Sequence, residues 1–145
     1  MALQFHPRQG TIVLARFDHA FKEPEMVKTR LAVVVSKDMQ ARRGLCTIVP
    51  LSLSKPQFVM RYHCQIDPQF ELPSPWGNQP RWVKGDMLLA AGFHRLDLLS
   101  LGKGSDGRRI YQTETISADD LGTIQACILE GLSLGGLTKR PQKPK

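Results

Sequence analysis

The sequence has no apolar run long enough to cross a bilayer, because no stretch approaches the ~18 consecutive apolar residues that a spanning helix needs. Residues 1–8 also lack the apolar segment of a secretory signal peptide. These two absences argue against the membrane-spanning and secreted classes. We therefore expect a cytoplasmic protein without a membrane partner.

Cysteine is scarce, and the three that occur, Cys46, Cys64 and Cys127, leave one over in any pairing and form no Cys-x-x-Cys motif. A disulfide framework or a zinc knuckle therefore has little support, and we expect no metal or other cofactor. A zinc or cysteine enzyme centred on His63 and Cys64 would need further ligands that the sequence does not place. We interpret the thiols as small, partly buried side chains in a reducing compartment.

The composition is that of an ordinary globular domain. The 145 residues suffice for one packed core, and the hydrophobic and charged contents of 41% and 23% lie close to globular averages. We find no internal repeat. We expect a single domain over residues 1–138, followed by a disordered basic tail at 139–145, where lysine and arginine are interleaved with proline.

The charge balance is basic, with 20 lysines and arginines against 13 aspartates and glutamates and a net charge of +7. A basic surface favours a polyanionic partner, because neutralising phosphates releases counterions. Charge alone does not define a function, since part of it lies in the tail.

Short β-type runs dominate the chain. Period-two or continuous β-branched patterns predict strands at 11–17, 31–36, 47–53, 59–66, 87–93 and 109–113. Turn-rich segments separate them, at 21–29, 38–44 and 68–80, and a polar turn at 102–107 precedes the last strand.

One convincing long helix is predicted near the C-terminal end. Ser117 is a typical N-cap, and acidic residues in the first turn complement the helix dipole. Apolar residues then recur at helical spacing, and Gly135-Gly136 ends the pattern. This face is formed by Leu121, Ile124, Ile128 and Leu132. Five or six short strands and one amphipathic helix predict a mainly β (α+β) fold, a small barrel whose C-terminal helix covers an open end or face.

One arginine and one serine stand where apolar runs begin and end. Arg30 directly precedes the run at 31–36, and Glu25 lies five residues before it in a polar loop. Ser52 stands two residues after Pro50 in the next run. A guanidinium forms a bidentate fork to phosphate, and a serine hydroxyl can donate to the same group. The alternatives are a surface arginine that caps the strand and an ordinary strand-end serine.

This order of residues resembles the MazF/PemK family, the small endoribonuclease toxins of bacterial toxin–antitoxin pairs. In that family a glycine opens the first strand, as Gly10 does here, and the strand ends near a pair such as Phe17-Asp18. The family's glutamate, arginine and threonine correspond to Glu25, Arg30 and Ser52. The resemblance extends over about residues 7–137 and implies the family's SH3-like barrel with a C-terminal helix.

The resemblance implies a metal-independent, sequence-selective endoribonuclease toxin. It would cleave single-stranded RNA by attack of the ribose 2′-hydroxyl, act as a homodimer, and be neutralised by a cognate antitoxin. Its implied catalytic residues are Arg30, Ser52 and Glu25. Its implied RNA-binding residues are Phe17, His19, Lys28, His94 and Arg95.

Several of these positions have other interpretations. Ser54 and Thr47 are alternative hydroxyls, and only the distance from Pro50 selects Ser52. His19 and His94 could act as acid or base, or could be half-exposed histidines at strand ends. Two tryptophans near the proline-rich segment, Trp76 and Trp82, could stack on bases or pin that loop to the domain.

Two departures from the family pattern leave a second function class open. The loop reads Pro24-Glu25-Met26-Val27 in place of the family's Ser-Glu-Gln-x-Gly, and Leu31 replaces the proline that follows the arginine. The family's later Lys/Arg-Ser pair is also absent. The alternative is a catalytically silent SH3-like module that binds nucleic acid or a protein peptide.

Overall fold

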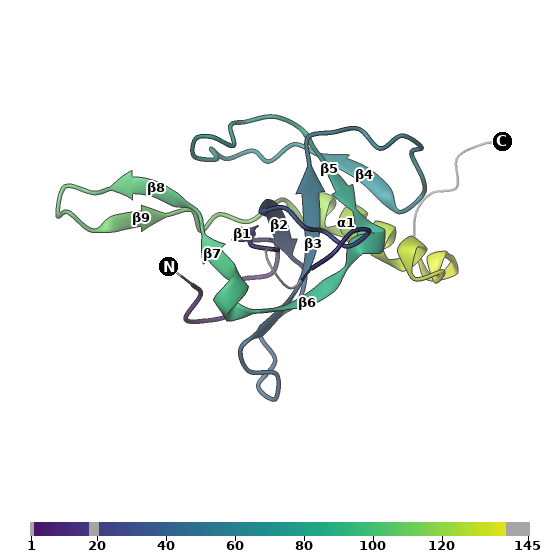
Figure 1. The fold of residues 1–145 in the computed structure, drawn as a ribbon, viewed down its shortest axis with the longest axis horizontal. Helices are drawn as coiled ribbons and strands as arrows, with labels where there is room; N and C mark the ends of the chain where they lie inside the picture. The colour runs from purple at the N-terminus through teal and green to yellow at the C-terminus, as the bar shows by residue number, and fades with distance from the viewer. Residues whose placement is uncertain (1, 18–20, 139–145) are drawn as a thin grey trace.

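The protein consists of short strands and one longer helix (Figure 1). The computed structural model describes residues 2–17 and 21–138, and the predicted tail at 139–145 lies outside them. In chain order the elements, with η marking a 3₁₀ helix, are β1 (Ile12–Ala15), β2 (Arg30–Val34), β3 (Leu45–Ser52), β4 (His63–Ile66), β5 (Arg81–Lys84), η1 (Gly85–Met87), β6 (Leu89–Gly92), η2 (Phe93–Arg95), β7 (Leu96–Leu98), β8 (Ser100–Lys103), β9 (Arg109–Tyr111), α1 (Ala118–Gly131) and η3 (Gly135–Leu137). None of the described helices is long and apolar enough to cross a membrane.

Antiparallel strands form the main sheet in the order β4-β5-β3-β2-β1-β7, and β6 also pairs with β3. β8 and β9 form a separate hairpin that projects from the body, at the left of Figure 1. The predicted mainly β fold with a C-terminal helix is confirmed. The order of paired strands begins at β4 and ends at β7, so the sheet is open and not closed into a barrel.

The predicted strands agree best with the strands of the structure where the apolar runs are long. β1, β2 and β3 lie within or next to the predicted runs at 11–17, 31–36 and 47–53. The run at 59–66 contains only β4, because its first half is a loop. β5 and β7 were not predicted, since strands of four and three residues carry too little periodicity to stand out.

Side chains from both faces of the sheet are buried, in two separate clusters. Successive residues of β2 alternate between them, because neighbouring side chains on a strand point to opposite faces. Leu31 and Val33 join one cluster with Ile124 and Ile128 of α1, and Ala32 and Val34 join the other. α1 therefore covers one face of the sheet. The even-numbered residues of β2 point to the opposite face.

The start of α1 confirms the predicted cap. The Ser117 side chain accepts a hydrogen bond from the Asp120 amide at 3.1 Å. The predicted end at Gly135-Gly136 is wrong, because α1 ends at Gly131 and Ser133 has a φ of 61°, which a continuing helix does not allow. Leu132 therefore lies beyond the helix and is exposed.

Two glycines allow α1 to contact η1 backbone to backbone. A Cβ placed on Gly85 would lie 2.7 Å from the carbonyl carbon and oxygen of Cys127, and one on Gly131 would lie 2.8 Å from Cα of Asp86. No side chain fits at either position without moving the main chain. This close contact fixes the position of η1, which follows β5, relative to α1.

Candidate active site

Arg30 and Ser52 lie just beyond the paired part of β2 and β3, at positions that the register assigns to the same face of the sheet. β2 and β3 pair antiparallel with Ala32 opposite Pro50, and extending that register by two residues places Arg30 opposite Ser52. Side chains directly opposite each other in an antiparallel pair share a face, with Cβ atoms about 4.5–5.5 Å apart. The register of β2 and β3 therefore favours a position close to each other for the two residues selected from sequence.

Both groups keep unused hydrogen-bonding capacity. The Arg30 Nε atom is buried and has no hydrogen-bond partner among the described residues. Ser52 is buried, and its Oγ accepts from the Ser54 amide at 3.2 Å, which leaves its O–H to donate elsewhere. Thr47 is excluded as the partner hydroxyl, because it lies toward the opposite end of β3 and accepts a hydrogen bond from Arg42 at 2.6 Å.

β5 and β4 extend the same face with further polar and aromatic residues. Trp82 lies opposite Ser52, and Lys84, two residues further along β5, lies opposite His63. Lys84 is therefore a diagonal neighbour of Ser52, within reach of a long side chain. The Nδ1 atom of His63 accepts from the Met60 amide at 3.1 Å, so in the neutral ring Nε2 carries the proton.

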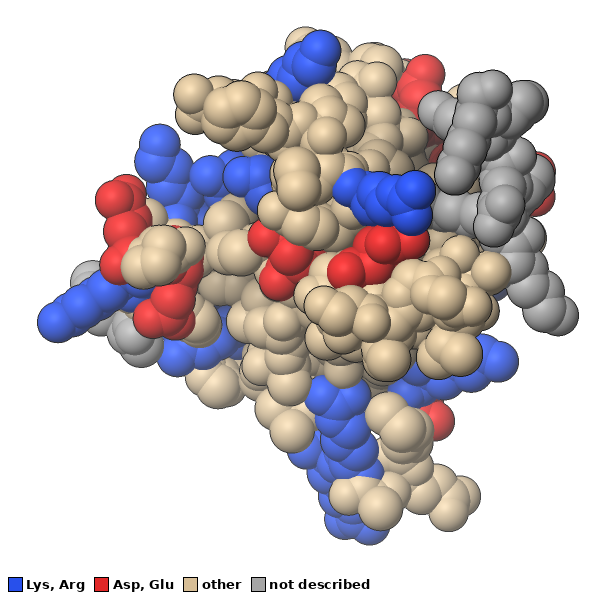
Figure 2. All heavy atoms as spheres, turned by 90° about the vertical axis from the view of Figure 1, so that its right-hand side faces the viewer, with Lys and Arg blue, Asp and Glu red and all other residues tan. Residues whose placement is uncertain are grey.

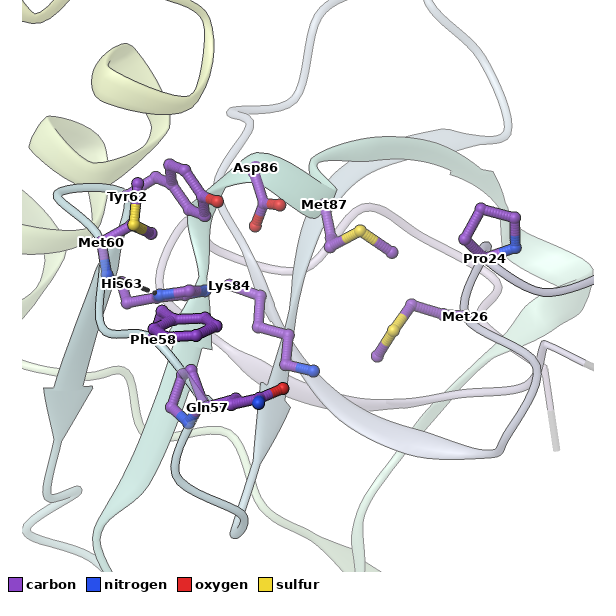
Figure 3. Close-up of a pocket in the computed structure, with 11 residues that line it drawn as sticks. Pro24, Met26, Gln57, Phe58, Met60, Tyr62, His63, Lys84, Asp86 and Met87 are labelled. Carbon is purple, nitrogen blue, oxygen red and sulfur yellow. Dashed lines mark hydrogen bonds between the residues drawn. The ribbon is translucent and has the colours of Figure 1, made fainter.

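A pocket of about 420 Å³ opens on this face, between the β1–β2 loop, the β3–β4 loop and η1 (Figure 3). Its walls combine polar and apolar surface in about equal measure. The lining residues are Pro24, Met26, Pro56, Gln57, Phe58, Met60, Tyr62, His63, Lys84, Asp86 and Met87. None of the polar lining residues is among the site residues predicted from sequence, because they lie on short strands or in loops whose patterns do not bring them together.

The predicted loop residues lie at the surface. Glu25 is exposed, and its amide donates to the Lys22 carbonyl at 2.8 Å in a turn of the β1–β2 loop. Lys28 is exposed two residues before Arg30. The described structure records no hydrogen bond or ion pair between Glu25 and Arg30, so the carboxylate does not orient the guanidinium in this conformation.

The other predicted RNA-binding residues are spread more widely. Arg95 is half-buried, and its guanidinium lies 5.0 Å from the centre of the Phe21 ring in the β1–β2 loop. His94 is exposed at η2. Phe17 is 1% exposed, so its ring packs in the core beside Phe21. His19 lies outside the described residues.

Trp76 pins the proline-rich loop at 68–80 to the domain. It packs against a core cluster, and its carbonyl accepts from buried Arg81 at 2.5 Å. The Arg81 guanidinium also lies 6.0 Å from the Trp76 ring centre. Burial lowers the pKa of Arg81. These contacts make Arg81 a loop anchor and leave phosphate binding to more exposed cations.

Burial raises the pKa of the Cys46 thiol to about 11, with a smaller opposing effect of Arg42. Such a thiol is a poor nucleophile near neutral pH. Among the residues that the structure describes, no three His, Cys, Asp or Glu side chains are grouped to hold a metal ion.

Figure 2 shows the molecule from the right-hand side of Figure 1. Basic side chains are spread over this face and gather at its lower end, and acidic side chains lie near its centre. The net charge of +7 is therefore not concentrated in one patch on this face. Hydrogen-bond geometry locates the site more sharply than charge does.

The fold is that of a small antiparallel β protein with one C-terminal α-helix. A family model described as the PemK-like, MazF-like toxin of type II toxin–antitoxin systems matches residues 8–130. The chain belongs to this family, as the order of its residues indicated.

Solved structures show the same fold at low sequence identity. A MazF from Deinococcus radiodurans is 17% identical with a TM-score of 0.57, over 90% of this chain and 99% of that one. The Mycobacterium tuberculosis toxin MazF-mt6 is 17% identical with a TM-score of 0.54, over 86% and 97%. An endoribonuclease in complex with its cognate antitoxin, from a mycobacterial species, is 15% identical with a TM-score of 0.54, over 89% and 97%. A comparison with curated proteins finds no match.

Proposed function

We propose that this protein is a metal-independent, sequence-selective endoribonuclease that cleaves single-stranded RNA. The observation that supports the proposal is the buried Nε atom of Arg30, which no described residue satisfies, near the end of β2 where the extended register would put Ser52 across from it. A buried donor without a partner costs free energy unless a ligand pairs with it. A phosphate oxygen is the ligand that an arginine and a hydroxyl on one face suit best.

The chemistry needs no metal. The ribose 2′-oxygen attacks the adjacent phosphorus, the bond from phosphorus to the 5′-oxygen breaks, and the products are a 2′,3′-cyclic phosphate and a 5′-hydroxyl. The 2′-hydroxyl proton goes to a base and the 5′-oxygen receives a proton from an acid. Arg30 and Ser52 stabilise the charge that builds on the phosphate oxygens. Glu25 is the proposed proton acceptor.

We further propose that the protein works in the cytoplasm as a homodimer whose two copies share the RNA groove. A cognate antitoxin then neutralises it by laying an extended or helical segment across that groove. The β3–β4 loop offers exposed apolar side chains for such a contact, among them Phe58, Val59 and Met60. Sedimentation equilibrium should give about twice the 16.3 kDa chain mass, and a monomer at micromolar concentration would contradict the shared groove.

A catalytically silent module that binds nucleic acid is the second candidate. The solvent-facing Glu25, which makes no described contact with Arg30, favours it. The two candidates differ in one experiment, incubation of the protein with mixed-sequence RNA in excess EDTA. The endoribonuclease should produce fragments that end in 2′,3′-cyclic phosphate, whereas salt-sensitive binding without cleavage of any RNA would select the silent module.

A further inference from the structure

The pocket that Lys84 lines near Ser52 contains polar groups to which the proposed cleavage assigns no role. Its polar atoms comprise one carboxylate, on Asp86, and two hydrogen-bond donors, Lys84 Nζ and His63 Nε2. Gln57 and the Tyr62 hydroxyl can each donate or accept, so they do not select between ligands. The pocket volume of about 420 Å³ lies within the range of small-molecule sites.

The two donors are held on the sheet. Lys84 and His63 lie opposite each other on β5 and β4, on the face that carries Ser52. The hydrogen bond from the Met60 amide fixes the His63 ring with Nε2–H as its free donor. The donors therefore keep a constant position relative to Ser52.

The acceptor is held by the helix. Asp86 follows Gly85 in η1, and the backbone contact of Gly85 and Gly131 leaves η1 no room to shift against α1. The described structure records no ion pair for either Asp86 or Lys84. In Figure 3 their charged ends point to different sides of the pocket. Both groups are thus available to a ligand that separates them.

The walls suit a flat aromatic ring. Met26, Met60 and Met87 supply flexible, polarisable side chains from three different segments. Phe58 is 72% exposed at the pocket edge, where a ring can stack on it. Pockets that read unpaired bases combine such stacking with hydrogen bonds to the base edges.

From this arrangement we infer that the pocket binds a guanine base, that of a nucleotide adjoining the scissile phosphate. The inference rests on the proposed endoribonuclease function and names the base that the site selects. The Asp86 carboxylate accepts from the N1–H and N2–H₂ groups of guanine. Lys84 and His63 donate to its O6 and N7 acceptors.

Other bases match this set less well. Adenine presents an acceptor, N1, to the carboxylate and offers it only the N6 amino group. Cytosine and uracil each offer the carboxylate a single donor position on their pairing edge. Among the four bases, only guanine offers two donors on one edge, one for each carboxylate oxygen of Asp86. Its O6 and N7 are also adjacent acceptors that Lys84 and His63 can reach. Asp86 is therefore the specificity-determining residue, with Lys84 and His63 as its complement.

Binding of 2′-O-methyl RNA hexamers tests the inference, because these oligonucleotides cannot undergo 2′-hydroxyl attack. A uridine hexamer with one central guanosine should bind about tenfold or more tightly than those with adenosine or cytidine, as expected for a bidentate base contact. Inosine, which lacks the N2 amino group, should fall between them. Asp86→Asn should remove the guanosine preference, whereas the charge-matched surface change Asp67→Asn should leave it intact.

The methionines locate the binding site in the same experiment. With carbon-13-labelled methionine methyl groups, the guanosine hexamer should shift the signals of Met26, Met60 and Met87. Met39, which lines a separate pocket, is the internal control and should not shift. Equal affinity for all hexamers, a guanosine preference that survives Asp86→Asn, or a shift confined to Met39 would overturn the inference.

The outcome is separable from that of the proposed cleavage. A protein that prefers the guanosine hexamer but cuts no RNA would refute the cleavage and keep the pocket assignment. A protein that cleaves RNA without any guanosine preference would refute the pocket assignment and keep the cleavage.

Discussion

The two ends of β3 carry similar residue types and differ in how their hydrogen bonds are arranged. At the Thr47 end, Arg42 donates to the Thr47 hydroxyl at 2.6 Å, and His6 pairs with the Ser36 hydroxyl at 2.9 Å. At the Ser52 end, Arg30 keeps a buried nitrogen without a described partner.

Each end also has a pocket with an aromatic residue and methionine on its wall. The difference therefore does not lie in composition. Polar groups that satisfy one another stabilise the fold, and polar groups left unpaired at a pocket are arranged for a ligand. The contrast supports the proposal that the Thr47 end stabilises the fold and the Ser52 end binds the substrate.

Arg30→Ala should give the largest effect. It removes the positive fork at the phosphate, and the loss of one preorganised donor typically lowers the rate by ~10²–10³. The measurement is the cleavage rate of RNA in EDTA, with circular dichroism to confirm the fold.

Arg42→Ala is the matched control at the other end. It should leave cleavage near the wild-type rate and lower the free energy of unfolding by about 1 kcal/mol, because it breaks one internal hydrogen bond. If both variants lost cleavage equally, the assignment of chemistry to one end would fail.

Ser52→Ala should have an intermediate effect. A hydrogen bond to a charged group is worth about 1.5–3 kcal/mol, so the cleavage rate should drop by roughly tenfold to a hundredfold. Thr47→Ala, which removes the corresponding hydroxyl at the other end, should leave the rate unchanged. A normal rate for Ser52→Ala together with a slow Ser54→Ala would transfer the role to Ser54.

The smallest effect concerns stability at high pH. Cys46 lies at the Thr47 end, and burial raises the pKa of its thiol from 9.0 to about 11. Above pH 9 the unfolded chain releases this proton while the folded chain keeps it, so stability falls as the pH rises through that window. Relative to Cys46→Ala, the wild-type protein should lose about 1 kcal/mol of unfolding free energy by pH 10. Parallel pH profiles in urea denaturation would contradict this assignment.

The sequence predicts the parts of the fold that carry long patterns. The apolar runs around β1, β2 and β3 and the Ser117 cap have direct physical signals, and the structure contains them. The helix end was misplaced because Leu132 continues the apolar spacing although the chain has already left the helix at Gly131.

The candidate site, like the fold, has a part that the sequence predicts and a part that it does not. Arg30 and Ser52 were found because a family motif surrounds them, and the register then explains why two residues far apart in sequence meet. Lys84 and Asp86 are not among the predicted site residues, because β5 and η1 are short and the residues that line the pocket with them lie on other segments. The family resemblance implies an RNA-binding role for Phe17, but its burial follows from packing that one sequence does not reveal.

The most direct test of the central claim uses an RNA with a single deoxyribose on the 5′ side of the scissile bond. The account predicts that this strand binds as tightly as the all-ribose strand and is not cleaved, because the phosphate contacts of Arg30 and Ser52 remain while the nucleophile is missing. The all-ribose strand should be cleaved in excess EDTA to a 2′,3′-cyclic phosphate. Cleavage of the deoxyribose strand, or activity that requires added metal, would contradict the account.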